Sequence, residues 1–216
     1  MIGILLVFGV CTTVFSLQEN WSSLNISFGN YFESGQDMED MYMGSLGMGL
    51  SLYSFFDKKN VGIFVNVGWH FPVTHNLTNG YDPAIQFDLL LGPGFRYSFK
   101  QNLKMHFGFG FNFRGFYLYK TESSLVKFSD SRTIFGVGGD IGIRYDITNI
   151  INISVGTTLF YDFANNRRME STADNWKTTV RDSDGWVRNY AMFGISPYIA
   201  IGFNYYGETG KYGKPN

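Results

Sequence analysis

The segment LKMHFGFGFNFRGFYLY, residues 103–119, alternates between large apolar side chains and small or polar ones. In an extended chain successive side chains point to opposite faces, so one face carries Leu, Met and a row of Phe. The other face carries Lys104, His106, Asn112 and Arg114, with glycines between them. Either the aromatic face packs into a soluble core, or it meets lipid while the charged face lines an enclosed lumen.

The same period of two recurs along the chain, and no helical periodicity persists for more than a few residues after Trp21. The connections alternate between long polar stretches and short ones, of which FDKKN, KQN and TNI are the short ones. This rhythm is typical of an up-and-down barrel in an outer membrane, which has tight turns at one end and long loops at the other. The predicted strands are residues 21–32, 41–55, 61–71, 84–99, 103–117, 133–147, 151–163 and 189–206.

Energetics favour the arrangement in which the aromatic face meets lipid. Eight strands enclose a space just wide enough for side chains, too small for the large apolar residues of every strand. The inverted arrangement would expose Arg96, Lys104, Arg114 and Arg144 to hydrocarbon, at a cost of up to about 2–4 kcal/mol each at mid-depth. The sequence therefore predicts an all-β, eight-stranded antiparallel up-and-down transmembrane β-barrel, with first and last strands paired so that no edge is open.

Composition agrees with this fold. Charged residues make up 16% of the chain, against about 25% in typical soluble domains. Aromatic residues make up 19%, and there are 26 glycines. Together these values indicate β-structure with limited contact with bulk water. The net charge of −1 gives no reason to expect a nucleic-acid partner.

The two ends of the chain differ from the barrel region, which we expect to be residues 17–206. Residues 1–16, MIGILLVFGVCTTVFS, form an uncharged apolar run that is typical of a signal peptide, although no Lys or Arg precedes it. Residues 207–216 are polar, and we expect a short periplasmic tail there. With an even number of strands, both barrel termini would be periplasmic and the long loops extracellular.

The inward face supplies a candidate polar network. If the KQN turn is centred on Gln101, Asp88 lies opposite Arg114 and Arg96 lies opposite His106. We expect Asp88 and Arg114 to form an internal ion pair joined by Asp162, because an unpaired Arg is costly in a poorly solvated lumen. We also expect a second charged layer near the short turns. Its predicted members are Arg96, Lys104, His106, Arg144 and Asp146.

With Asp140, these residues form the predicted lumen network. We interpret it as the polar packing of a narrow barrel, and the alternative is a selectivity region in a conductive path. Inward glycines leave room, while inward Tyr53, Phe64, Phe160 and Tyr198 are able to fill it. The sequence leaves open whether the result is a plug or a cavity. The pair at residues 138–139, Gly-Gly, is a candidate β-bulge.

The long loops are the other candidate for function. ESGQDMED, residues 33–40, forms an acidic tip that includes Glu33 and Asp37. The stretch 164–188 contains Trp176 and Trp186, and an exposed Trp on a long loop is able to anchor a partner. The alternative is that these two residues pack the loop onto the barrel rim.

Signals for enzymatic, metal or cofactor chemistry are weak. His70 faces inward and is able to meet Asp88, but no Ser at a defined spacing completes a triad. No metal spacing such as CxxC or HxxxH occurs. We therefore expect no catalytic residues, no metal site and no cofactor.

Over residues 21–206 the pattern resembles the small eight-stranded outer-membrane barrels of bacteria, namely the OmpX and OmpW type and the barrel domain of OmpA. The closing strand IAIGFNYY is similar to their assembly signal, except that Ala200 stands where Gly is usual and a polar tail follows. The resemblance implies outer-membrane lipid and the barrel assembly machinery as partners.

For function, the resemblance implies two alternatives. OmpX-like members are closed barrels whose loops meet environmental or host partners. OmpW-like members are thought to pass small hydrophobic molecules through a narrow lumen with a lateral opening. Because the lumen here is lined with charges, we expect a non-enzymatic barrel with a structural role and interacting loops. The narrow channel for small molecules remains the alternative.

Overall fold

The computed structural model describes residues 19–35, 38–56, 60–75, 82–83, 85–122, 126–173, 176–180 and 191–206. The expected signal peptide, residues 1–16, and tail, residues 207–216, lie outside this part of the chain. Among the described residues, no helix has the length and hydrophobicity that a membrane crossing requires. The strands are β1 (Glu19–Gly35), β2 (Met38–Phe55), β3 (Val61–His75), β4 (Asp82–Pro83), β5 (Gln86–Lys100), β6 (Leu103–Glu122), β7 (Val126–Asp146), β8 (Ile151–Ala173), β9 (Trp176–Val180) and β10 (Ala191–Tyr206).

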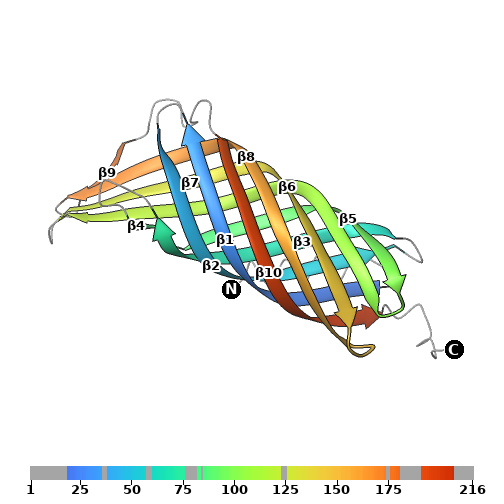
Figure 1. Ribbon diagram of the computed structural model, residues 1–216. Helices are drawn as coiled ribbons and strands as arrows, with labels where there is room; N and C mark the ends of the chain where they lie inside the picture. The colour runs from blue at the N-terminus through green and yellow to red at the C-terminus, as the bar shows by residue number, and fades with distance from the viewer. Residues whose placement is uncertain are drawn as a thin grey trace.

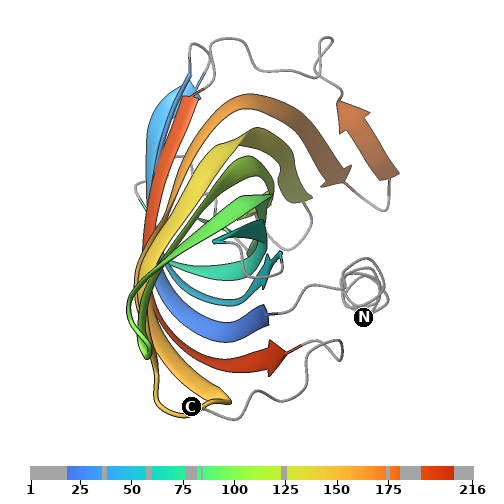
Figure 2. The ribbon, with the colours of Figure 1, turned by 90° about the vertical axis from the view of Figure 1, so that its right-hand side faces the viewer.

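The strands form a closed, all-antiparallel barrel (Figures 1 and 2). Neighbours in sequence pair around the wall, and β10 pairs with both β8 and β1. The closing ladder runs from Glu19–Tyr206 to Ser34–Ala191. The eight predicted strands correspond to β1, β2, β3, β5, β6, β7, β8 and β10, which confirms the fold class and the pairing of first and last strands.

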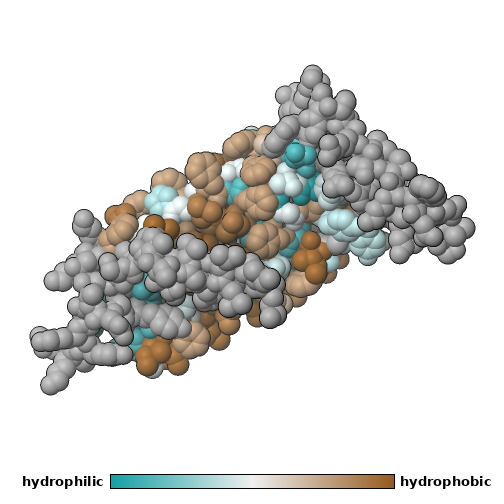
Figure 3. Space-filling model, turned by 180° about the vertical axis from the view of Figure 1, so that it is seen from behind, coloured by the Kyte–Doolittle hydropathy of each residue, from teal (hydrophilic) through white to brown (hydrophobic). Residues whose placement is uncertain are grey.

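The two faces of the wall have the predicted character. Along β6, Phe107, Phe109 and Phe111 are exposed on the outer surface, and 74% of Phe111 is accessible. On the inner face, Asn112 and Arg114 are buried. Figure 3 shows hydrophobic residues over the outer wall, as a surface in contact with hydrocarbon requires. The aromatic row is therefore on the outside of a closed cylinder, and the cationic residues are inside.

The connections at one end are tight turns, which we call the short-turn end. Gln101 and Asn102 form the turn between β5 and β6, and residues 147–150 connect β7 to β8. The first residues of β1 pair with the last residues of β10, so both barrel termini also lie at this end. The predicted short turns KQN and TNI are confirmed.

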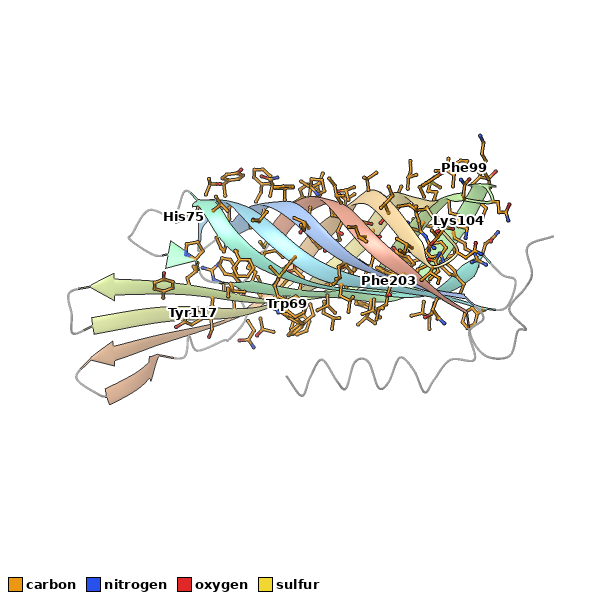
Figure 4. All side chains as sticks on the ribbon, turned by 90° about the horizontal axis from the view of Figure 1, so that it is seen from below. Trp69, His75, Phe99, Lys104, Tyr117 and Phe203 are labelled. Carbon is orange, nitrogen blue, oxygen red and sulfur yellow. The ribbon has the colours of Figure 1, made fainter. Side chains whose placement is uncertain are left out.

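The opposite end, which we call the hairpin end, differs from the expected long loops. Residues 33–35 and 38–40 of the acidic stretch continue β1 and β2, and Gly35 pairs with Met38. Likewise β6 continues to Glu122, which pairs with Val126, the first residue of β7. The ladder of β8 with β9 ends at the pair Ala173–Trp176. Continued ladders satisfy backbone hydrogen bonds locally, which an irregular loop does not. These strands project beyond the barrel (Figures 1 and 4).

The expected bulge at residues 138–139 is wrong. Gly138 and Gly139 pair in unbroken register with Phe160 and Leu159. The register shift in β7 lies between Phe135 and Gly136 instead. A β-bulge requires one extra residue on one of the two paired strands. The conformational freedom of two consecutive glycines does not by itself provide that extra residue.

Inward glycines provide the space that inward rings occupy. A Cβ added at Gly108 would lie 2.4–2.7 Å from ring atoms of Phe64, and one at Gly156 would lie 2.6 Å from the Tyr198 ring. Phe64 comes from β3, which does not pair with the β6 strand of Gly108, whereas Tyr198 on β10 is the direct ladder partner of Gly156 on β8. The Phe64 ring therefore reaches past β5 to the bare backbone of β6, and the Tyr198 ring lies against the bare backbone of its ladder partner.

We predict that Gly108→Ala destabilises the barrel by about 1–3 kcal/mol, because its new methyl group overpacks a buried ring that has no room to move. The matched control is Gly115→Ala on the same strand, where a Cβ meets nothing within 4 Å. Equilibrium unfolding in urea with lipid vesicles measures both variants. Equal stability of the two variants would contradict this account of ring packing.

Candidate functional site

The lumen contains three layers of charged and polar side chains between the short-turn end and the hairpin end. The short-turn layer consists of Lys104, Arg144 and Asp146. The middle layer consists of Tyr53, His106, Asp140 and Tyr198. The hairpin-end layer consists of His70, Asp88, Arg114 and Asp162. Figure 4 places Lys104 at the short-turn end and Trp69 further towards the hairpin end.

In the short-turn layer, one carboxylate holds two cations. Asp146 lies 3.1 Å from Lys104 Nζ and accepts a hydrogen bond of 2.6 Å from Arg144 Nη2. Arg144 also donates to Asn204 and lies 3.8 Å above the Trp21 ring. Its guanidinium is thereby held by charge, hydrogen bonds and a cation–π contact together. Lys104, Arg144 and Asp146 therefore lie in contact near the short turns, as predicted.

Arg96 lies near this layer, whereas His106 does not belong to it. The Arg96 guanidinium lies 4.6 Å from the Phe55 ring and 5.9 Å from the Trp21 ring. His106 pairs with Arg96 in the ladder, as predicted, but its Nε2 lies 3.0 Å from the Tyr198 hydroxyl across the lumen. His106 therefore belongs to the middle layer and not to the expected charged layer near the short turns. Ladder neighbours share a level on the wall, but long side chains inside a cylinder reach strands on the far side.

The middle layer is centred on Asp140, a nearly inaccessible carboxylate. Its oxygens accept hydrogen bonds of 2.5 Å from Tyr53, 3.2 Å from Tyr198 and 3.1 Å from Thr158. His106 Nε2 lies 3.4 Å away. These four contacting side chains come from β2, β6, β8 and β10, while Asp140 is on β7. One carboxylate thus connects five strands, which compensates for its removal from water.

The hairpin-end layer has the ion pair that the register predicts. Asp88 is opposite Arg114 in the ladder, and Asp88 Oδ1 lies 3.1 Å from Arg114 Nε. Asp162 joins at 3.5 Å and also accepts a 2.8 Å hydrogen bond from Asn112. The Arg114 guanidinium lies 3.9 Å from the Phe160 ring. The chain therefore holds a fully buried arginine between two carboxylates and an aromatic face.

Between the middle and hairpin-end layers there is a cavity of about 20 Å³. Its lining includes His70, Asp88, Thr158, Phe160 and Tyr198. A space of this size holds about one water molecule. At this level the interior is a plug, which answers the question that the sequence left open. Beyond the hairpin-end layer an apolar cluster of buried residues follows, consisting of Tyr31, Met43, Phe116, Leu118, Ile134, Phe160 and Met192.

The structure brings a serine to His70, which the sequence reasoning missed. His70 Nε2 lies 2.7 Å from Asp88, as expected, and His70 Nδ1 lies 3.4 Å from Ser45 Oγ. A hydrolytic triad requires the serine on Nε2 and the acid on Nδ1, with a shorter contact to the nucleophile. Here the nitrogens are used in reverse and all three side chains are buried. The arrangement differs from a hydrolytic triad, and the cavity that His70 and Asp88 line has a volume of about 20 Å³.

The register of the short hairpin between β2 and β3 contains the signal for Ser45. Gly47 pairs with His70, which places the next inward residue, Ser45, beside the imidazole. The turn FDKKN was recognised, so the same pairing argument that found Asp88–Arg114 would have found this contact. The hydroxyls of Tyr53 and Tyr198 also need partners when buried, and that need points to an inward carboxylate such as Asp140.

The candidate surface contacts are not brought together by the described part of the chain. Glu33 lies in β1 and Trp176 in β9. Asp37 and Trp186 lie outside the described residues. Within those residues, no group of three or more His, Cys, Asp or Glu side chains is arranged to hold a metal ion.

Comparison with known proteins gives structural matches only. No protein-family model matches the chain, and no curated protein matches it. The outer-membrane protein AlkL in lipid bilayers matches with a TM-score of 0.57 and 13% identity, over 94% of this chain and 95% of that one. The outer-membrane protein OprG from Pseudomonas aeruginosa matches with a TM-score of 0.55 and 10% identity, over 88% of this chain and 97% of that one. Neisserial surface protein A matches with a TM-score of 0.51 and 10% identity, over 85% of this chain and 95% of that one.

At these identities the likeness concerns the fold. The chain has the fold of the small outer-membrane β-barrels, as its alternation of residues predicts. The roles of the lumen residues have to be argued from this chain's own contacts.

We predict that Arg114→Met destabilises the barrel by about 3–5 kcal/mol, because it leaves Asp88 and Asp162 as buried carboxylates without their cation. Unfolding in urea with lipid vesicles measures the change. Replacing all three charges, as Arg114→Met with Asp88→Asn and Asp162→Asn, should recover most of the loss, since removing a whole buried network is often neutral. Lys100→Met, at an exposed position, is the control for loss of a cation.

We predict that a serine-reactive fluorophosphonate does not label Ser45 in the folded protein, because its hydroxyl is buried and faces no substrate-sized space. Mass spectrometry of the digested protein measures labelling, with Ser45→Ala as the background. Labelling that disappears in Ser45→Ala and in His70→Gln would mean that the serine is activated and accessible, against a packing role.

Proposed function

We propose that the protein is a non-enzymatic bacterial outer-membrane protein whose plugged barrel serves as an anchor and whose projecting hairpins contact an extracellular or host partner. The observation that carries the proposal is the filled lumen. Layers of ion pairs and rings cross it, and the cavity between two of them has room for about one water. A barrel with a filled lumen has its outer wall and its ends available for contacts with other molecules.

The hairpin end supports the second part of the proposal. Pairing of β5 with β6 ends at Phe87–Gly115, and pairing of β8 with β10 ends at Asp162–Met192. Beyond these pairs, β6, β7, β8 and β9 remain paired with one another, and β4 pairs with β6 at Tyr119 and Leu118. The distal parts of these strands project past the barrel (Figures 1 and 4). No described strand pairs with the far edge of β9. An open strand edge in water presents backbone donors and acceptors that another chain is able to use.

The proposal includes the location and orientation that the sequence predicts. The barrel lies in the outer membrane with lipid against its aromatic face, and the barrel assembly machinery inserts it. The short-turn end and both barrel termini are periplasmic, and the projecting sheet is extracellular. The tight turns and the paired ends of β1 and β10 support this orientation.

We predict that the purified protein is electrically silent in planar lipid bilayers, because among the described residues ion pairs and rings fill the lumen and the cavity between two of its layers has room for about one water. A porin added to the same membrane is the positive control. Discrete openings that hydrophobic solutes block would contradict the proposal and would favour the narrow channel for small molecules.

The matching test of the hairpins removes residues 169–180, the distal part of β8 together with β9. Bacteria that display this variant should lose adhesion to host cells or extracellular matrix while the barrel still resists heat-induced unfolding on gels. Arg114→Met is the opposite control, because it weakens the barrel but leaves the projecting sheet intact. Equal adhesion of wild type, trimmed variant and a strain without the protein would contradict a role for the hairpins.

A further inference from the structure

The outer wall of the barrel has a hollow of about 670 Å³ on its membrane-facing side. Five strands contribute to it, namely β5, β6, β7, β8 and β10. We call it the outer groove. Its walls are large apolar side chains that are exposed on the outer surface, and its floor is mostly glycine backbone. The residues that line it are Leu91, Gly92, Pro93, Phe109, Gly110, Phe111, Val137, Gly138, Gly139, Leu159, Phe160, Tyr161 and Phe193.

Gly139 forms part of the floor, and a Cβ added there would meet only the Gly108 carbonyl oxygen within 4 Å. It occupies an outward position of β7, between Val137 and Ile141, where the alternation otherwise places large apolar residues. Its ladder neighbours are Phe109 and Leu159. An outward position without a side chain, set between two tall neighbours, leaves a hollow in a wall that is otherwise covered.

Pro93 and two more glycines extend the floor across β5 and β6. Pairing of these strands stops at Leu91–Phe111 and resumes at Gly94–Gly108, and Pro93, which has no N–H to donate, lies in the gap. A Cβ added at Gly110 would lie 1.9 Å from the Leu91 carbonyl oxygen. Because the backbones approach so closely here, this part of the floor consists of main-chain atoms and the Pro93 ring.

The groove lies at mid-height of the wall and carries no charge. Gly139 is midway between Phe135 and Ile143, both exposed on the outer surface. The sole polar side-chain atom among the lining residues is the hydroxyl of Tyr161. Water and lipid headgroups are absent at this depth of a bilayer, so the surrounding medium is hydrocarbon. An unfilled hollow would forfeit dispersion contacts on all its walls.

We propose that the outer groove is a binding site for a single acyl chain of a membrane lipid, which lies over Gly139 between Phe109, Phe111 and Leu159. The site is continuous with the lipid-contacting wall and admits only hydrocarbon. Its volume is within the range of about 300–1,000 Å³ that is typical of small-ligand sites. The proposal rests on membrane insertion, and it is independent of adhesion and of conductance.

A second copy of the chain fits the groove less well. Standard protein interfaces use about 20–30 residues on each side, whereas 13 residues line the groove. The wall around it is convex, so a second barrel would have to insert a narrow ridge into it. A flexible chain takes the shape of a hollow without such a requirement.

The test uses the full-length protein in phosphatidylcholine vesicles that contain a lipid with a nitroxide label near the terminal methyl of one acyl chain. Electron paramagnetic resonance then measures the number of motionally restricted chains per barrel. Gly139→Leu fills the floor, and its Cβ meets only the Gly108 carbonyl oxygen at 3.2 Å. We expect this variant to lose one restricted chain per barrel. Ile143→Phe, which adds volume on the same strand outside the groove, should leave the number unchanged.

Equal numbers of restricted chains in the wild type and Gly139→Leu would overturn the proposal. If Gly139→Leu does not fold, Phe111→Ala decides, because it removes a wall that is 74% exposed and should also lose the chain. A wild-type dimer that either groove variant dissociates, measured by sedimentation, would mean that a second copy occupies the groove, and this outcome also overturns the proposal. Absence of any restricted lipid would instead refute membrane insertion itself.

Discussion

The constraint on which the whole structure depends is that a strand wall in hydrocarbon has no solvent for its backbone. An open edge there would leave N–H and C=O groups without partners, each at a cost of several kcal/mol. Pairing of β10 with β1 removes that edge. Closure then fixes a narrow interior, and every polar side chain on the inner face has to find its partners within it. For Arg114 these partners are two carboxylates, and for Asp140 they are three hydroxyl groups.

Glycine has a different use on each face of the same wall. On the inner face, Gly108 and Gly156 give up side-chain volume so that Phe64 and Tyr198 are able to lie flat against the backbone. The result is a filled interior. On the outer face, Gly139 has no side chain in a wall that otherwise carries large apolar residues, and the result is a hollow. Phe160 lines both the inner cavity and the outer groove, so at this residue the wall between the polar interior and the membrane side is thin.

Alternation of residues predicted the strands and which face of each strand points outward, because the side-chain period of a strand is fixed by covalent geometry. Hairpin register predicted Asp88 opposite Arg114, because the turn centred on Gln101 determines that pairing. Neither rule reaches across the lumen, and for that reason the contacts of His106 with Tyr198 and of Tyr53 with Asp140 were not predicted. At the hairpin end the polar stretches predict loops, whereas the structure has continued strand ladders there. A bulge was expected from glycine alone at residues 138–139, although the register there is unbroken.

The long sequence separation of the cross-lumen contacts has a consequence for the order of folding. Tyr53 and Asp140 are 87 positions apart, and Asn66 and Thr158 are 92 apart, whereas each hairpin of the wall joins neighbours in sequence. Local pairings form early because little chain entropy is lost in closing them. The interior contacts have to wait until the sheet has curled and its last strand has arrived. Packing of the plug is therefore the late step of assembly, and the wall serves as the template on which it forms.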